Sequence, residues 1–353
     1  MTLLTPREID RTLDTIAACQ EPDGCISWYP GGKADPWDHV EAAMALGVGG
    51  RRREAERAYE WMVANQLPEG AWGFYYRDGT VEDPTRDANF AAYTATAVWH
   101  HFLLGDDLGF LEAMWPTVER AVDFVLDLQT PGGEITWSRD ADGRPGAFAL
   151  LTSSSCIHLS LRCAIATAER LGHERPDWEL SLGSVAYAVG RAVGEEPDRF
   201  EPKDRFSMDW YYPVLGGVVT GDAARARLAE RWDTFVVPGR GVRCVADEPW
   251  VTAAETCELV IALDLAGRRD DAVRLFDWVQ YLRDGDGSYW TGHNYVMDVH
   301  YPEGERTSWT AAAVVLAAHV LAGDGATSSL FRGHGLPAGV EPSELTGDRS
   351  RRP

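Results

Sequence analysis

Two hydrophobic patterns alternate along this chain, and both are helical. In the segment 51–66, Ala55, Tyr59 and Met62 recur at three- and four-residue spacing among many charges, which predicts an amphipathic helix with one solvent-facing side. The segment 89–104 is apolar nearly all round and contains no acid or lysine, which is typical of a helix buried inside a protein. The chain therefore predicts pairs of one outer and one inner helix.

The alternation repeats six times. Outer helices are expected to begin near Asp10, Arg51, Gly109, Asp177, Asp222 and Arg268. Inner helices are expected to begin near Trp37, Ala88, Leu150, Tyr211, Trp250 and Trp309. Inner-to-outer connections are short, whereas outer-to-inner connections are long and rich in Trp, Tyr, Asp and Gly. We predict an all-α (α/α)6 toroid with the long loops on one rim, and an open helical solenoid is the alternative.

The repeat also defines the domain organisation. We predict one (α/α)6 catalytic domain over residues 1–321. Residues 322–353 mix Gly, Ser, Pro and charge, so we expect a C-terminal tail that wraps the surface or is disordered.

A related phrase follows several outer helices. It runs Gln20-Glu21-Pro22-Asp23-Gly24 then Trp28, Gln66 to Gly70 then Trp72, Gln129 to Gly133 then Trp137, and more loosely Asp284 to Gly287 then Trp290. Pro and Gly turn the chain, and the aromatic ring is expected to pack over the helix ends. We interpret the phrase as a feature of the fold. It is similar to the Gln–Trp repeat of terpene cyclase and prenyltransferase toroids and to loops of helical-toroid glycosidases.

Charge and composition narrow the choice of partners. The 33 basic and 55 acidic residues give a net charge of −22, which disfavours nucleic acid and anionic membranes. The start of the chain has no signal-peptide pattern and no segment is apolar enough for a membrane span, so we expect a cytoplasmic protein. The six scattered cysteines predict core thiols, not disulfides or a zinc site: Cys19, Cys25, Cys156, Cys163, Cys244 and Cys257.

A terpene-cyclase or prenyltransferase toroid is disfavoured by its missing motifs. The segment Asp140-Ala141-Asp142-Gly143 lacks the last acid of an Asp-x-Asp-Asp motif. Asp106-Asp107 is not followed by the third Asp that would help to hold magnesium diphosphate, and no zinc trio is apparent. A diphosphate would also meet a strongly acidic protein. We keep this class only as an alternative.

The acids at the starts of the inner helices are the main candidates for chemistry. Asp38 opens the first inner helix beside Trp37, and Glu255 opens the fifth after Trp250. Glycoside hydrolysis needs one protonated and one ionised carboxyl group, and sugar faces stack on aromatic rings. We predict Asp38 and Glu255 as the catalytic pair.

The surroundings of the two acids favour one division of roles. Glu255 lies among alanines in an apolar helix, which favours a raised pKa and the acid role. Asp38 lies beside His39 and near Lys33, which favours its ionised form and the base role. The reverse assignment stays open, because the sequence does not give distances.

The loops supply further candidates for sugar binding. They are Trp37, Trp72, Tyr75, Asp87, Asn89, Asp209, Trp210, Tyr211, Trp250, His293, Tyr295, His300 and Trp309. Asp87 has the alternative of a helix cap. His158 is expected to be a core histidine with satisfied hydrogen bonds. Glu303 and Glu305 also precede the sixth inner helix.

The Trp37-Asp38 and Trp250 to Glu255 helix starts resemble those of six-hairpin glycosidases with glucoamylase-like toroids. Within that group the chain looks like the actinobacterial proteins often labelled prenyltransferase-like, which include the mycobacterial methylmannose polysaccharide hydrolases. The resemblance covers roughly residues 10–321. It implies endo-acting, inverting hydrolysis of internal α-1,4-mannosidic bonds in a cytoplasmic, partly methylated polysaccharide.

The function predicted is therefore an inverting glycoside hydrolase with an oligosaccharide or polysaccharide substrate and no metal or organic cofactor. A glycan lyase or epimerase would use bases such as His300 or Tyr212. A toroid that binds a glycan or lipid without catalysis is the non-enzyme alternative. The sequence does not define the oligomeric state.

Overall fold

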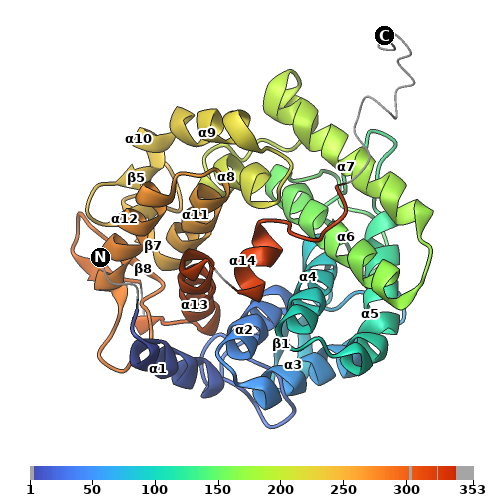
Figure 1. Cartoon of the computed structure of the whole chain (residues 1–353), viewed down its shortest axis with the longest axis horizontal. Coiled ribbons are helices and arrows are strands. Elements are labelled where there is room, and N and C mark those ends of the chain that lie inside the picture. The colour runs from blue at the N-terminus through green and yellow to red at the C-terminus, as the bar shows by residue number, and fades with distance from the viewer. Residues whose placement is uncertain (1–3, 302–303, 324, 339–353) are drawn as a thin grey trace.

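The computed structural model describes residues 4–301, 304–323 and 325–338, and it is mostly helical (Figure 1). Six helices form an inner set: α2 (Pro36–Val48), α4 (Ala88–Gly105), α6 (Leu151–Leu171), α8 (Ser207–Leu215), α11 (Ala253–Leu265) and α13 (Ser308–Ala322). Six outer helices surround them: α1 (Pro6–Ala17), α3 (Arg52–Asn65), α5 (Leu108–Leu126), α7 (Pro176–Gly194), α9 (Gly221–Glu230) and α12 (Arg269–Val279). The described chain is mostly helical, as the sequence predicted.

The inner helices contact one another in chain order. Each packs against the next from α2 to α13, and α13 packs against α2. Each outer helix packs on an inner one, with α3 on α2, α5 on α4, α7 on α6, α9 on α8, α12 on α11 and α1 on α13. Figure 1 shows the outer helices around the inner ones, with the N-terminal α1 beside α13.

The burial of the two helix sets follows the sequence pattern. On α3, Ala55, Ala58, Tyr59, Trp61 and Met62 are buried while the charged side lies toward solvent. On α4, every residue from Ala91 to Phe102 is buried. The outer helices therefore bury one face and the inner helices nearly their whole circumference, as predicted.

Two inner helices begin at other residues than expected. Helix α8 begins at Ser207 instead of near Tyr211. Trp250 lies in strand β7 (Trp250–Thr252), and α11 begins only after it, at Ala253. Strand β7 forms because its backbone pairs with neighbouring strands on both sides, a long-range contact that local hydrophobic spacing does not reveal.

The long loops contain antiparallel strands that the sequence did not predict. A hairpin joins β1 (Tyr75–Arg77) and β2 (Thr80–Asp83), and β3 (Arg86–Asp87) pairs with β4 (Ser138–Arg139). A five-stranded sheet has the order β5 (Val236–Val237), β6 (Gly241–Arg243), β7, β8 (Gly292–Asn294) and β9 (Val299–His300). In it, Trp250 pairs with Asn294 and Thr252 with Gly292.

The repeated loop phrase attaches each loop to the next outer helix. The side-chain amide of Gln66 donates to the carbonyls of Gly70 in its own loop and Thr117 on α5, at 2.8 and 2.9 Å. Gln20 bridges its loop to α3 and Gln129 bridges its loop to α7 in the same way. The phrase therefore has the role in the fold that we predicted, since it fixes the loops that carry the inner helix starts.

The segment after residue 321 differs from expectation. We expected residues 322–353 to wrap the surface or to be disordered, but α14 (Ala326–Phe331) packs against α13 and α4. Leu330 and Phe331 are buried because they cover the apolar ends of the inner helices. Helix α14 lies at the centre of the face seen in Figure 1. The part of the tail from 339 to 353 lies outside the described residues.

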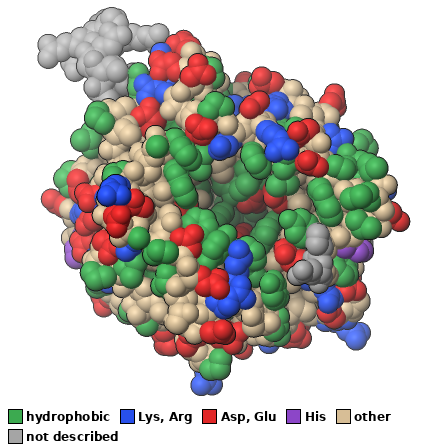
Figure 2. All heavy atoms as spheres, turned by 180° about the vertical axis from the view of Figure 1, so that it is seen from behind, with side chains coloured by type: hydrophobic (Ala, Val, Ile, Leu, Met, Phe, Trp, Pro, Cys, Tyr) green, Lys and Arg blue, Asp and Glu red, His purple; other side chains and the backbone are tan. Residues whose placement is uncertain are grey.

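The face opposite α14 is hollowed at its centre. Figure 2 shows this face, with hydrophobic and acidic side chains inside the hollow and along its edge. None of the helices in the described ranges is long and apolar enough to cross a membrane.

The loop phrase leads to a prediction about stability. Gly70 has φ +99°, and a Cβ there would lie 2.0 Å from the Arg120 carbonyl oxygen. Gly79 has φ +71° and open space around it. We expect Gly79→Ala to cost about 1–2 kcal/mol from the left-handed backbone alone, and Gly70→Ala to cost about 1–3 kcal/mol more because it also displaces a helix backbone. Urea unfolding of both variants measures the difference, and equal losses would contradict the loop attachment.

Candidate active site

The site begins with two acids at the start of α2. Asp35 is the N-cap, and its carboxylate accepts hydrogen bonds from the Asp38 amide at 2.9 Å and the Trp28 indole at 2.8 Å. Asp38 follows in the first turn, where the helix dipole favours a carboxylate. The sequence Asp35-Pro36 produces this start because Pro suits the first helical position.

Asp38 is surrounded by other acids. Burial raises the pKa of the Asp38 carboxyl well above its usual range, and the charge of Asp35 and the hydrogen bond to it raise this pKa further. The charges of Glu41 on the same helix and Glu258 on α11 act in the same direction. The acids of α2 and α11 therefore face one common space, and Asp38 keeps its proton to a higher pH than an ordinary aspartic acid does.

Helix α11 carries the second group of acids. Glu255, in the first turn, is only 9% exposed, and its Oε2 has no hydrogen-bond partner within the described part of the chain. The thiol of Cys244 lies beside Glu255, whose charge raises the pKa of that thiol. One turn further on, Glu258 accepts hydrogen bonds from the hydroxyls of Tyr211 and Tyr212, and burial together with Glu255 raises its pKa to about 8.

The inner end of the hollow lies between these helices. Glu41 and Glu258 line it together with aromatic and apolar residues of α2, α4, α6, α8 and α14: Trp37, Tyr93, Cys156, Leu159, Tyr212, Leu215, Gly216, Ile261 and Phe331. This end encloses about 20 Å³, roughly the room for one water molecule. Phe331 of α14 thus closes the hollow from below, and a substrate must enter from the loop face.

Aromatic rings surround the acids. Trp37 packs edge-on against Tyr93, with ring centroids 4.4 Å apart. Tyr75 lies near Asp35 and Asp38. Burial raises the pKa of the Tyr75 hydroxyl, and the charges of the two acids raise it further. The ammonium of Lys33 lies over the rings of Tyr75 and Trp28, at 3.6 and 4.2 Å from their centroids.

The reason given from sequence for an ionised Asp38 is wrong. His39 is buried and hydrogen-bonds the Ala58 carbonyl and the Ile26 amide, and burial lowers its pKa to about 4. Lys33 is held by aromatic rings and is not among the groups that shift the pKa of Asp38. Burial and, after it, the neighbouring acids therefore raise the pKa of Asp38, and no cation is needed to explain its protonation.

Several predicted binding residues have structural roles. Trp72 and Trp210 are buried and donate their indole N–H groups to the carbonyls of Met62 and Arg227, so neither can stack on a substrate. Asp209 accepts a hydrogen bond from Thr152 and links α8 to α6. The predicted substrate-binding roles of these three residues are wrong, because their side chains form hydrogen bonds between packed helices and loops instead.

Two other predicted binding residues have supporting roles near the site. Tyr211 is fully buried, but its hydroxyl holds the carboxylate of Glu258. Asp87 caps α4 by accepting from the amides of Asn89 and Phe90, the alternative that we named for it. Burial raises the pKa of Asp87 to about 7, with a smaller contribution from the charge of Asp35.

The remaining candidates flank the acids at helix starts or lie on the sheet. Trp37 and Trp309 are half-buried, and their indole N–H groups lack partners within the described ranges, as does Oδ1 of Asn89. Such orphan groups are suited to bind sugar hydroxyls. Trp250, His293, Tyr295 and His300 lie on or between β7, β8 and β9, and no contact joins them to Asp38. Glu303 lies outside the described residues.

The sequence analysis missed Asp35 and Glu258 and gave no role to Glu41. Glu41 is three residues after Asp38, and Glu258 is three residues after Glu255, so each pair lies on one side of its helix. The sequence did contain a signal for these residues, because an acid with no basic partner in an otherwise apolar inner helix is unusual.

The predictions for His158 and for free cysteine thiols agree with the structure. His158 is buried and its Nδ1 donates to the Gly216 carbonyl at 2.8 Å, as expected for a core histidine. All six cysteines are free, and all but Cys244 are buried. No cluster of three metal-binding side chains occurs among the residues described.

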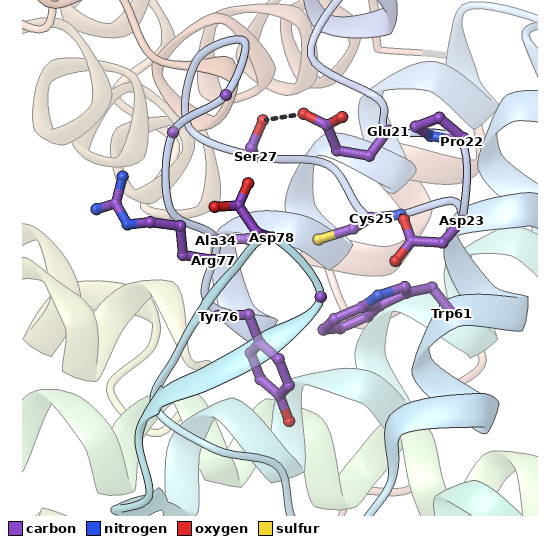
Figure 3. Close-up of a pocket in the computed structure, with 13 residues that line it drawn as sticks. Glu21, Pro22, Asp23, Cys25, Ser27, Ala34, Trp61, Tyr76, Arg77 and Asp78 are labelled. Atoms are coloured by element: carbon purple, nitrogen blue, oxygen red, sulfur yellow. Dashed lines mark hydrogen bonds between the residues drawn. The ribbon is translucent and has the colours of Figure 1, made fainter.

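A second cavity of about 280 Å³ lies beside the first long loop and the β1–β2 hairpin (Figure 3). Figure 3 shows Trp61 and Tyr76 below it and the carboxylates of Glu21, Asp23 and Asp78 around it. Asp38, Glu255 and Glu258 do not line this cavity. The opposed acids of α2 and α11 therefore place the candidate active site in the central hollow.

Solved structures with the same fold include several carbohydrate enzymes. A crystal structure of D-mannose isomerase has a TM-score of 0.69 at 11% identity and covers 90% of this chain and 96% of its own. A glycosidase in complex with glucose has a TM-score of 0.67 at 17% identity, and an α-amylase from Clostridium perfringens has 0.64 at 10%. Each of these covers 90% of this chain and 99% of its own. At such low identity the likeness concerns the fold alone.

A closer relative is found by sequence. No family model matches the chain. The chain is 50% identical over 339 residues to the MMP endo-(1,4)-3-O-methyl-alpha-D-mannosidase of Mycolicibacterium hassiacum. The match covers 96% of this chain and 93% of the relative. The chain therefore belongs to the family of this endo-mannosidase.

Proposed function

We propose that this chain is an endo-acting α-mannosidase that hydrolyses 1,4 bonds of a 3-O-methylated mannose polysaccharide, the activity named for its relative. The observation that carries the proposal is the group of acids from α2 and α11 that faces one aromatic-walled hollow. Glycoside hydrolysis requires a pair of carboxyl groups, one as acid and one as base or nucleophile, and these two helices supply candidates for both. It needs no metal or organic cofactor.

The raised pKa of Asp38 favours the reverse of the roles that the sequence favoured, with Asp38 as the acid and Glu255 as the base. Burial raises the pKa of Asp38 and the surrounding Asp35, Glu41 and Glu258 raise it further, so Asp38 is suited to protonate the leaving oxygen. Glu255 has an oxygen free of hydrogen bonds within the described residues, so it is suited to accept a proton from the attacking water. Asp38 is thus the acid and Glu255 the base.

The aromatic rings and orphan polar groups provide the binding surface. Trp37, Tyr75 and Trp309 are half-buried, so part of each ring is available to the apolar faces of mannose units. The free N–H groups of Trp37 and Trp309 and the free oxygen of Asn89 can bind sugar hydroxyls. We include Trp250 as a ring further along the same loop face.

The proposal also includes a closed ring of helices, the bounds of the catalytic domain, the class of partner and the cellular location. The cyclic contacts of the inner helices support a closed (α/α)6 toroid, with the catalytic domain over residues 1–321. The acidic charge supports a neutral polysaccharide substrate and disfavours nucleic acid and membranes as partners. A cytoplasmic location stays a prediction from sequence.

The two catalytic residues lead to a prediction about activity. We expect Asp38→Asn and Glu255→Gln each to reduce kcat by about 10²–10⁴-fold, because each removes one proton transfer. Reducing ends released from methylated 1,4-mannan measure the loss. Asp222→Asn and Glu60→Gln, on exposed parts of the outer helices, are the matched controls and should retain activity. Full activity in either site variant would remove that residue from the mechanism.

The separate acid and base lead to a prediction about stereochemistry. Direct attack of water inverts the anomeric centre, so the first product should be the β-anomer. Proton NMR during the first minutes of the reaction distinguishes it from the α-anomer. An initial α-anomer would mean a covalent intermediate and would overturn the acid–base pair.

The acid surroundings of Asp38 lead to a prediction about pH. Since the pKa of Asp38 is raised, its active protonated form persists to a higher pH than that of an ordinary aspartic acid and is lost as the pH rises through that pKa. Asp35→Asn removes the nearest negative charge but preserves a helix cap, so the alkaline limb of kcat/KM should move to lower pH. A limb that stays in place or moves to higher pH would contradict the assignment of Asp38 as the acid.

A further inference from the structure

The tip of the β8–β9 hairpin exposes apolar side chains to an unusual degree. Val296 and Met297 are 72% and 62% exposed, the highest values for large apolar side chains in the part of the chain described. Val299 and Tyr301, on the returning side, are 44% and 40% exposed. A contiguous exposed apolar patch of this kind commonly marks a binding surface.

This tip is held in one conformation although its apolar side chains are not buried. The Asn294 side-chain oxygen accepts hydrogen bonds from the amides of Val296 and Met297, at 3.1 and 3.0 Å. The carboxylate of Asp298, at φ +55°, lies 3.1 Å from Nε2 of His293. The chain thus presents Val296 and Met297 on a rigid turn, a form that lowers the entropy lost on binding.

The hairpin continues the sheet that leads into the candidate active site. Strand β7 pairs with β8 and ends at Thr252, three residues before Glu255 (Figure 1). The ring of Trp250 on β7 packs against Tyr301, with centroids 5.3 Å apart. Val296 and Met297 lie in the turn that follows β8, beyond the end of the β7–β8 pairing at which Trp250 faces Asn294.

We propose that Val296, Met297 and Val299 bind the O-methyl groups of mannose units that lie beyond the cleavage point. The inference rests on the proposed function and assigns the preference for a methylated chain to this patch. A methyl ether presents an apolar surface where a hydroxyl presents a donor, so aliphatic side chains favour the methylated sugar. The free hydroxyls of an unmodified mannan would lose water against the patch without gaining a hydrogen bond.

The charge of the molecule supports a neutral occupant. A net charge of −22 would repel an anionic lipid surface from the same patch. Asp298 stands between Met297 and Val299 in the sequence, and its exposed carboxylate lies 3.1 Å from Nε2 of His293. A second copy of this chain is the competing occupant, and its association is measured below.

The test compares two 1,4-mannan chains of equal length, one 3-O-methylated and one unmodified. The variant combines Val296→Thr, Met297→Gln and Val299→Thr, which preserve size and strand propensity. In the wild type, kcat/KM should favour the methylated chain, and the variant should lose this preference by about tenfold or more while its activity on the unmodified chain stays unchanged. Val63→Thr and Leu180→Gln, exposed on the outer helices α3 and α7, form the control.

Binding measurements separate this proposal from the proposed function. Calorimetry in the Glu255→Gln background gives Kd for both chains without turnover, so selective loss of the methylated chain supports the patch even if cleavage were absent. An unchanged ratio of the two Kd values in the hairpin variant overturns the proposal. Sedimentation that shows a wild-type dimer and a variant monomer, with the ratio unchanged, would assign the patch to self-association instead. Binding of neither chain to the Glu255→Gln protein would overturn both proposals.

Discussion

The crowding of acids in a poorly solvated space is the constraint on which this site depends. Asp35, Asp38 and Glu41 lie within seven residues on α2, and Glu258 faces them from α11. Carboxylates so close together in a poorly solvated space cannot all be ionised, so protons are retained at neutral pH. The fold therefore maintains an acid in its protonated form without a cation, and this form is what a glycosidase needs to start the reaction.

The rest of the fold keeps these acids in place against their repulsion. The Gln and Gly residues of the repeated phrase join the loops to neighbouring outer helices, as Gln66 does between its loop and α5. Tyr211 and Tyr212 hold Glu258 from α8, and Phe331 closes the hollow from the opposite face. The inner helices therefore carry clustered acids at the ends that face the long loops. At the opposite ends, α14 packs against their apolar residues.

The sequence predicted most of the fold and part of the site. The helix alternation and the loop phrase are local patterns, so they could be read from residues such as those of α3 and α4. Strand β7 and helix α14 depend on contacts with distant segments, and periodicity missed both. Asp38 and Glu255 were predicted from their place at helix starts, and their catalytic roles stay a proposal. Trp72 and Trp210 were not distinguished from ligand-binding aromatics, because only packing shows where an indole N–H points. The predicted effects of His39 and Lys33 on the ionisation of Asp38 were also wrong, because only packing shows which groups those side chains contact.

The protonation of Asp38 at neutral pH is the central claim, and carbon-13 NMR of its labelled side-chain carboxyl tests it most directly. The account predicts a titration midpoint well above the ordinary aspartate value of about 3.9, with the protonated signal still present at pH 7. A midpoint near the ordinary value would contradict the account, since Asp38 would then be ionised at neutral pH and could not protonate the leaving oxygen.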